Sequence, residues 1–428
     1  MFERHEGGES AILVHVNFND ENNREDVEEL QLLTESAGVT SCTVLTTSRN
    51  APHAKLFIGT GKTDELASLV KMHQADVVIF NHSLTPAQER NLERIIDCRV
   101  VDRTGLILDI FAQRARTHEG KLQVELAQLR HIATRLVRGR TYLEGQQGGV
   151  GMRGPGETQL ETDRRLLRAR ITNIQKRLDK VARQREQNRR ARKRNDIPTV
   201  SLVGYTNAGK STLFNRLTES DVYAADQLFA TLDPTLRKLE LPDVGDTILA
   251  DTVGFIRHLP HDLIAAFKAT LQETRDADLL LHVVDCADEN MRENIDEVNA
   301  VLEHIEADEV PVLMVFNKID KLDDPTARLE YDEQGMPRAA WISAQAQLGI
   351  DELLSALNQL LAGTQVEHQL TLPASESRLR SRLYELNAVL SESFGEQGEA
   401  VIDIRLQKAE WQRLLKQEGE LLESFISD

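Results

Sequence analysis

Residues 204–211, GYTNAGKS, have the types and spacing of a phosphate-binding loop. They fit the pattern GxxxxGK[ST], in which glycines let consecutive backbone N–H groups surround phosphate oxygens. The ammonium group of Lys210 would neutralise the β and γ oxygens, and the hydroxyl of Ser211 would bind Mg²⁺. An apolar run precedes the loop and a helical pattern follows it, which is the context that this motif requires. The sequence therefore predicts a nucleoside triphosphate site.

Three later positions could respond to the γ-phosphate. Thr231, in FATLD, could supply a second hydroxyl to Mg²⁺, and Asp251, at the end of the apolar run TILAD, could hold the metal through water. Gly254 could donate its backbone N–H to the γ-phosphate. We therefore predict Lys210, Thr231 and Gly254 as the catalytic residues.

Two further motifs predict that the base is guanine. Asp320, in the motif NKID, follows a buried-strand pattern, and its carboxylate could accept hydrogen bonds from N1–H and the 2-amino group of guanine, which adenine lacks. The motif SAQ, at 343–345, would donate a backbone N–H to O6. The predicted GTP-binding residues are Gly204, Tyr205, Thr206, Asn207, Ala208, Gly209, Lys210, Ser211, Thr212, Phe229, Ala230, Thr231, Leu232, Asp233, Asp251, Thr252, Val253, Gly254, Asn317, Lys318, Ile319, Asp320, Ser343, Ala344 and Gln345.

Alternating apolar runs and helical patterns must form the elements that position these residues. Between 11 and 110 the alternation predicts a small α/β layer with a parallel sheet, and between 198 and 362 it predicts a second one. LLLHVVD and VPVLMVFN are continuous apolar runs, typical of strands covered on both faces. The segment after Gly363 predicts a small α+β module. We therefore expect an α/β fold with a mostly parallel P-loop sheet.

The stretch between these layers has a helical period. Leu122, Leu126 and Leu129 repeat at steps of four and three, and so do Ile171, Ile174 and the residues around them. This pairing favours an antiparallel helical hairpin, with a glycine-rich tip at 141–160, over two ordinary core helices. The expected domains are an N-terminal α/β subdomain, the hairpin, the P-loop domain and the C-terminal module, at 1–105, 106–196, 197–364 and 365–428.

Composition restricts the classes of function. The three cysteines are scattered, which argues against a zinc site or a disulfide framework and favours a reducing, cytoplasmic compartment. No signal peptide, membrane span or lipid motif is visible, which disfavours a membrane-linked signalling switch. The net charge is −18, yet the segment 164–194 carries fourteen Lys or Arg against Asp179 and Glu186. One basic segment on an acidic chain predicts oriented binding to RNA, whereas the alternatives are a solvated helix face or a disordered linker.

Three stretches, at 102–129, 148–165 and 204–215, resemble the HflX-type translational GTPases, and the resemblance covers nearly the whole chain. It implies a protein that binds the large ribosomal subunit, extends its helical domain toward the peptidyl-transferase centre, and separates stalled or idle ribosomes into subunits. The expected partners are GTP, GDP and ribosomal RNA, and we expect a monomer. An RNA-binding assembly or storage factor that uses GTP only as a conformational ligand is the alternative. The predicted RNA contacts are Arg153, Arg164, Arg165, Lys176 and Arg177.

Two positions bear on hydrolysis. Phe255 stands where a water-orienting glutamine is expected and resembles the hydrophobic replacement found across this broad class of GTPases. We therefore expect slow hydrolysis by the isolated protein and stimulation on the ribosome. Asn207 resembles the P-loop asparagine of potassium-stimulated GTPases, so K⁺ is a candidate cofactor beside Mg²⁺, unless asparagine simply suits the turn.

Overall fold

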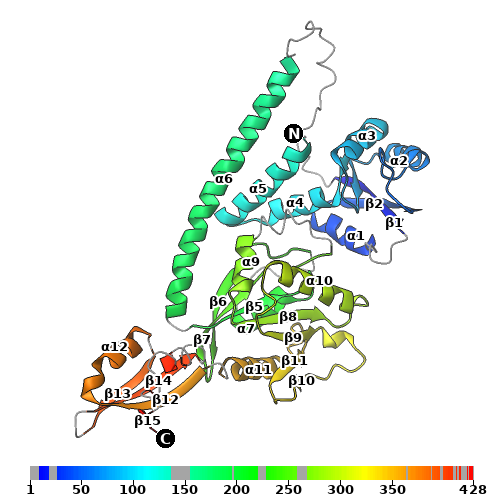
Figure 1. Ribbon diagram of the computed structural model, residues 1–428. Helices are drawn as coiled ribbons and strands as arrows, with labels where there is room; N and C mark the ends of the chain where they lie inside the picture. Colours follow the sequence, from blue (N-terminus) through cyan, green and yellow to red (C-terminus); the bar gives the residue numbers. More distant parts are fainter. Residues whose placement is uncertain are drawn as a thin grey trace. The chain divides into compact units, whose positions relative to one another are not determined.

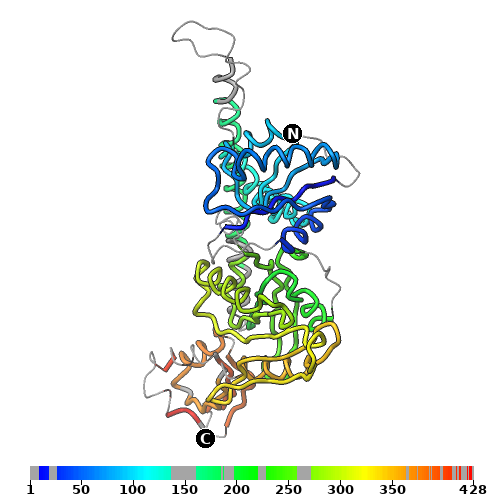
Figure 2. The backbone as a smooth tube through the Cα atoms, turned by 90° about the vertical axis from the view of Figure 1, so that its right-hand side faces the viewer, coloured from blue at the N-terminus to red at the C-terminus, as the bar shows by residue number. Residues whose placement is uncertain are grey.

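The computed structural model of the chain describes residues 9–18, 27–135, 155–194, 197–219, 228–257, 268–362 and, in the last part, 365–386, 388–395, 399–407, 411, 414–415, 422 and 424–427. Figures 1 and 2 give two views, coloured from the N terminus to the C terminus. The chain divides into two compact units. The first comprises Met1–Val181, Tyr223–Asp233 and Val253–Leu271, and the second comprises Ala182–Val222, Pro234–Thr252 and Gln272–Asp428.

The first unit contains a four-stranded parallel sheet, as the alternating pattern predicts. Its order is β2-β1-β3-β4, and helices connect the successive strands (Figure 1). The side chains of β1 from Ala11 to Val16 are buried because helices cover both faces of the sheet. The elements are β1 (Ser10–Phe18), α1 (Val27–Ser36), β2 (Thr40–Arg49), α2 (Thr60–His73), β3 (Val77–Phe80), α3 (Pro86–Ile96) and β4 (Arg99–Val101).

Three helices follow this sheet: α4 (Arg103–Arg114), α5 (His118–Arg135) and α6 (Pro155–Arg194). The heptad seam is confirmed, because Leu122 and Leu126 of α5 form a buried cluster with Ile174 of α6, lined by Leu129, Ile171 and Leu178. Burial of each large aliphatic side chain contributes about 1.5–3 kcal/mol, which explains why the two stretches pair.

The predicted tip at 141–160 extends too far. Helix α6 begins at Pro155, so residues 155–160 are helical, and the rest of the predicted tip lies outside the described residues. Proline suits the first turn of a helix because its fixed φ and missing N–H cost nothing there, and that signal outweighs the glycine that follows it.

The second unit contains a seven-stranded sheet of order β10-β11-β9-β8-β5-β7-β6. Its neighbouring strands are parallel except at the two edges, where β6 and β10 pair antiparallel with β7 and β11. The strands are β5 (Thr199–Val203), β6 (Thr235–Leu241), β7 (Gly245–Asp251), β8 (Leu279–Asp285), β9 (Val312–Asn317), β10 (Arg328–Tyr331) and β11 (Pro337–Trp341). The helices are α7 (Lys210–Thr218), α9 (Lys268–Arg275, which begins in the first unit), η1 (Ile319–Lys321), α10 (Met291–His304) and α11 (Ile350–Ala362).

The same unit ends in a small antiparallel sheet of order β13-β14-β12-β15. Its core includes Leu370, Leu383, Ile402 and Trp411. The elements are β12 (Gln365–Leu372), η2 (Ala374–Glu376), α12 (Ser377–Glu385), β13 (Val389–Phe394), β14 (Ala400–Gln407) and β15 (Ile426–Ser427). The predicted fold class is therefore confirmed. None of the helices among the described residues combines the length and apolar character needed to cross a lipid bilayer.

Candidate nucleotide site

The loop between β5 and α7 has the backbone that a phosphate cradle needs. Gly204 has φ +147° and Gly209 has φ +94°, values that residues with a Cβ adopt with strain. A Cβ at Gly204 would overlap the carbonyl oxygen of Val283, and a Cβ at Gly209 would overlap the side-chain amide of Asn317. Both glycines of the GxxxxGK[ST] pattern are therefore required by close neighbours as well as by φ.

Asn207 also has a left-handed backbone, with φ 60°. Asparagine is among the few residues with a Cβ that adopt this conformation readily. The local turn is thus sufficient to account for asparagine at this position.

Lys210 lies inside the loop. Its Nζ donates to the carbonyl oxygens of Gly204, at 3.0 Å, and Tyr205, at 2.6 Å. Burial lowers the pKa of Lys210 to about 8, so at neutral pH the ammonium is charged and largely removed from water. A charge in such surroundings interacts strongly with any anion that replaces those carbonyls.

Ser211 and Asp251, the predicted ligands of Mg²⁺ in this unit, lie in contact. The Ser211 hydroxyl donates to Oδ2 of Asp251 at 2.8 Å, and Asp251 is fully buried at the end of β7. Thr252 follows it, and its hydroxyl donates to the carbonyl of Leu202 at 2.6 Å, which fixes the end of β7 against β5. A hydroxyl beside a carboxylate is a donor set that suits Mg²⁺, which takes its remaining ligands from phosphates and water. The described residues contain no cluster of three or more His, Cys, Asp or Glu that could hold a metal ion.

The guanine motif is attached directly to the phosphate loop. The side-chain amide of Asn317 donates to the carbonyl of Ala208 at 2.9 Å, and its oxygen accepts the N–H of Ala344 at 2.9 Å. Asn317 therefore joins the phosphate loop to the SAQ segment. Lys318 adds a second link, because its Nζ donates to the carbonyl of Asn207 at 2.7 Å and forms an ion pair with Asp285 at 2.7 Å.

Asp320 and Ser343 lie side by side at the carboxyl ends of β9 and β11. The Ser343 hydroxyl donates to Oδ1 of Asp320 and accepts the N–H of Ala346 at 3.0 Å. The Asp320 side chain is exposed and Ser343 is buried, so the carboxylate is held at the surface with its orientation fixed from below. The structure thus brings together the phosphate loop, Asp251, the NKID segment and the SAQ segment within the second unit.

Thr231 and Gly254 belong to the first unit. Thr231 is half-buried, and Gly254 and Phe255 are buried. Among the predicted RNA contacts, Arg165, Lys176 and Arg177 are exposed on α6 and Arg164 is half-buried, whereas Arg153 lies outside the described residues. Arg177 also donates to the imidazole of His118 on α5, at 2.6 Å.

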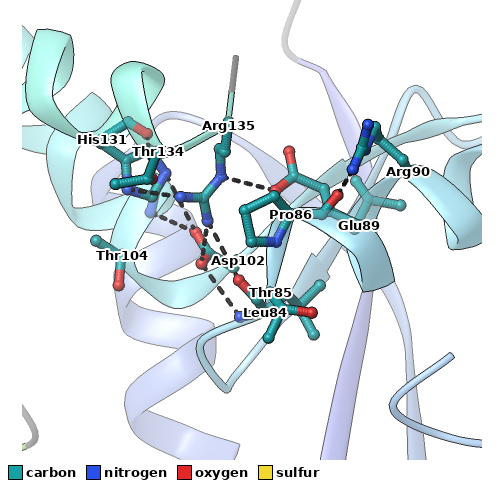
Figure 3. Close-up of polar contacts among 12 residues, drawn as sticks. Leu84, Thr85, Pro86, Glu89, Arg90, Asp102, Thr104, His131, Thr134 and Arg135 are labelled. Carbon is teal, nitrogen blue, oxygen red and sulfur yellow. Dashed lines mark hydrogen bonds and ion pairs between the residues drawn. The ribbon is translucent and has the colours of Figure 1, made fainter. Parts of the chain in front are cut away.

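Sequence patterns did not reveal the cluster that fixes the end of α5. Figure 3 shows Arg135, in the last turn of α5, donating to Asp102 at 2.7 Å and to Glu89 at 2.7 Å. Asp102 also caps α4 by accepting the N–H of Gly105, and it accepts the N–H of Leu84. Burial raises the pKa of Glu89 although Arg135 opposes the shift. The C-terminal end of α5 is therefore tied to the carboxyl edge of the first sheet. The one sequence signal for this cluster was an aspartate, Asp102, directly before a helical pattern.

His282, on β8, lies beneath the phosphate loop and makes stability depend on pH. It is 2 % exposed, and burial, with the charge of Lys210, lowers its pKa from 6.5 to about 4. Because the unfolded chain binds the proton first, His282 stabilises the fold fully above pH 6.5, and this contribution is lost as the pH falls to about 4. This lowering of the pKa corresponds to about 3 kcal/mol in the free energy of unfolding. We expect His282→Gln to flatten the pH dependence of the unfolding free energy between pH 6.5 and 4.

Urea titrations followed by tryptophan fluorescence would measure this. The chain has two tryptophans, Trp341 in β11 and Trp411 in the C-terminal core, so a Trp411→Phe background reports the sheet that contains His282. If the wild type and the His282→Gln variant showed equal slopes over that pH range, the prediction would be contradicted.

Comparison with known proteins agrees with this site. Residues 199–318 match the family described as "50S ribosome-binding GTPase", and residues 331–425 match "HflX C-terminal domain". Residues 24–112 and 114–192 match "GTP-binding GTPase N-terminal" and "GTP-binding GTPase Middle Region".

Proteins similar to this chain match it over most of their own length. The chain is 62 % identical over 426 residues to GTPase HflX of Escherichia coli (strain K12), covering 100 % of both chains, and 48 % identical to GTPase HflX of Magnetococcus marinus, covering 86 % of this chain and 85 % of that one. A crystal structure of a GTP-binding protein from Sulfolobus solfataricus with GDP is similar over 83 % of this chain and 99 % of that chain, at 24 % identity and a TM-score of 0.45. From its motifs, its geometry and this full-length identity, the chain belongs to the HflX family and is a P-loop GTP hydrolase.

Proposed function

We propose that this GTPase binds the large ribosomal subunit and separates stalled or idle ribosomes into subunits, with hydrolysis stimulated by the ribosome. The observation that carries the proposal is the exposed cationic face of α6 on an otherwise acidic chain. Exposed cations of this face include Arg165, Arg168, Lys176, Lys180 and Arg183. A local positive charge on a negative protein favours contact with RNA through one helix only, so binding is oriented.

The nucleotide would be held by the residues of the second unit. Lys210 binds the phosphates, Asp320 reads guanine, and Ser211, with Asp251 through water, holds Mg²⁺. When bound, Mg²⁺ neutralises charge on the β and γ oxygens. Thr231 and Gly254 respond to the γ-phosphate, so the triphosphate state differs from the diphosphate state in these two segments. Phe255 cannot orient a water, which is why we expect slow hydrolysis until the ribosome is bound.

Neutralising the face of α6 tests the ribosomal part of the proposal. Changing Arg165, Arg168, Lys176, Lys180 and Arg183 to glutamine should weaken binding to purified large subunits by about 10²- to 10⁴-fold at 0.1 M salt, and should reduce the salt dependence of binding. GTP hydrolysis without ribosomes should not change, because these side chains lie outside the nucleotide site. Sedimentation of large subunits at several salt concentrations measures both quantities.

A matched control removes as many exposed cations elsewhere, at Lys71, Arg94, Arg237, Lys238 and Arg338. If the two variants bind equally well, the effect is one of net charge and the proposal is wrong.

Splitting is tested separately with intact ribosomes: a non-hydrolysable GTP analogue should release subunits and trap the protein on the large one. A protein that binds large subunits equally with GDP and the analogue, and releases none, is instead an RNA-binding assembly or storage factor.

A further inference from the structure

The segment that contains Thr231 is attached to the first unit on both sides of that residue. Before it, the N–H of Leu228 donates to the Ser36 hydroxyl at 3.0 Å, and Phe229 packs against Phe111 of α4 with ring centroids 4.7 Å apart. Phe229 is buried and has φ 55°, a strained value for an aromatic residue that its surroundings must maintain. These contacts attach the residues before Thr231 to α1 and α4.

After Thr231, Asp233 binds the start of the hairpin helix α5. Its Oδ2 accepts the backbone N–H of Arg116 at 2.8 Å and of Thr117 at 2.9 Å, and its Oδ1 accepts the Thr117 hydroxyl. The Thr117 hydroxyl in turn accepts the N–H of Gly120 at 2.9 Å. Thr117 therefore caps α5, and Asp233 places a negative charge at the helix N terminus, where the helix dipole favours it.

Gly120 shows how closely the carboxylate is enclosed. A Cβ at this position would overlap Oδ1 of Asp233. Glycine in the first turn of a helix is unfavourable by propensity, so its presence here suits the space that the carboxylate occupies. All these contacts lie within the first unit, although Asp233 is more than a hundred residues from Thr117 in the chain.

We propose that Asp233 is a positioning residue: it fixes the Thr231 segment to the first turn of α5, so that ordering this segment on GTP also orders the start of the hairpin. The sequence predicts Asp233 as a nucleotide contact, whereas in the structure its carboxylate accepts hydrogen bonds from Arg116 and Thr117. The coupling is reciprocal, so whatever stabilises the start of α5 also favours the triphosphate state.

The test compares GDP with a non-hydrolysable GTP analogue on the isolated protein. Asp233→Asn leaves one acceptor oxygen, which can accept the two backbone N–H groups but leaves an amide N–H₂ facing the Thr117 hydroxyl, and it removes the negative charge at the start of α5. We expect this variant to lower the affinity for the analogue about tenfold and to slow hydrolysis about tenfold. GDP affinity should stay within twofold of wild type, because GDP needs only the residues of the second unit. In the wild type, amides of Gly120 and Lys121 should gain hydrogen-exchange protection when the analogue replaces GDP, and in the variant they should not.

Gly120→Ala separates positioning from helix stability. Alanine raises helix propensity but its Cβ displaces the Asp233 carboxylate. A merely structural role therefore predicts equal loss of GDP and analogue affinity, whereas the proposal predicts the same selective loss of analogue affinity as in Asp233→Asn. Gly61→Ala is the matched control, because Gly61 lies in the first turn of α2 with nothing within 4 Å of an added Cβ. The proposal is overturned if Asp233→Asn and Gly120→Ala keep the wild-type ratio of analogue to GDP affinity, or if GDP affinity falls as much as analogue affinity.

Discussion

Asp320→Asn should lower the affinity for GTP by roughly 10³-fold or more and should make xanthosine triphosphate the preferred nucleotide. In the proposed site, the Asp320 carboxylate would accept hydrogen bonds from N1–H and the 2-amino group of guanine. An asparagine offers one acceptor and one donor, which match the N1–H and the C2 carbonyl of xanthine. A site built around such pairs discriminates against a mismatched base by roughly 10⁴–10⁵, because polar groups are left unpaired.

The structure indicates that the Asp320→Asn substitution would change base recognition without changing the orientation of the side chain. The Ser343 hydroxyl donates to Oδ1 of Asp320, and an asparagine carbonyl oxygen can accept the same bond, so the side chain keeps its orientation. Competition of both triphosphates against a fluorescent GDP measures the two affinities. Asp323→Asn, which alters an exposed carboxylate three residues later, is the matched control and should leave the preference for GTP unchanged. A variant at Asp320 that still prefers GTP would show that guanine is read elsewhere.

The sequence was sufficient where a structural element depends on neighbours in the chain. The phosphate loop could be predicted because a glycine pattern between a strand and a helix has one common backbone solution. The hairpin could be predicted because leucine and isoleucine repeats of equal length bury one another, as Leu126 and Ile174 do. Even the misplaced start of α6 had a local signal, the proline at its first position.

Partners distant in the chain could not be predicted. Nothing around Asp102 indicates that Arg135 binds it, and nothing around Asp233 indicates Thr117. Such pairs depend on where the sheet and helices bring chain segments, which a single sequence does not state. The consequence matters for function, because these two pairs fix the two ends of α5, and α5 is one arm of the hairpin.

Lys210→Ala should slow single-turnover GTP hydrolysis by about 10³-fold, the scale expected when a fixed charge is removed from a transition state that gains charge. The Lys210 ammonium is already buried and oriented by the carbonyls of Gly204 and Tyr205, so little reorganisation is needed when phosphate oxygens replace them. Burial also lowers its pKa to about 8, which leaves it charged at pH 7 and weakly screened by water.

Two further variants serve as comparisons for Lys210→Ala in the hydrolysis measurement. Lys238→Ala removes an exposed lysine, paired with Asp246, from the edge strand β6, and should hydrolyse GTP at the wild-type rate. Lys210→Arg keeps the charge but not the compact shape, and a planar guanidinium does not fit between the two carbonyls that hold the ammonium. We therefore expect the Lys210→Arg variant to recover less than roughly a tenth of the wild-type rate. Hydrolysis by Lys210→Ala within tenfold of wild type would mean that another group neutralises the γ-phosphate. Because Lys210 is the one cationic side chain in residues 204–211, that group would have to be a cation from outside the loop.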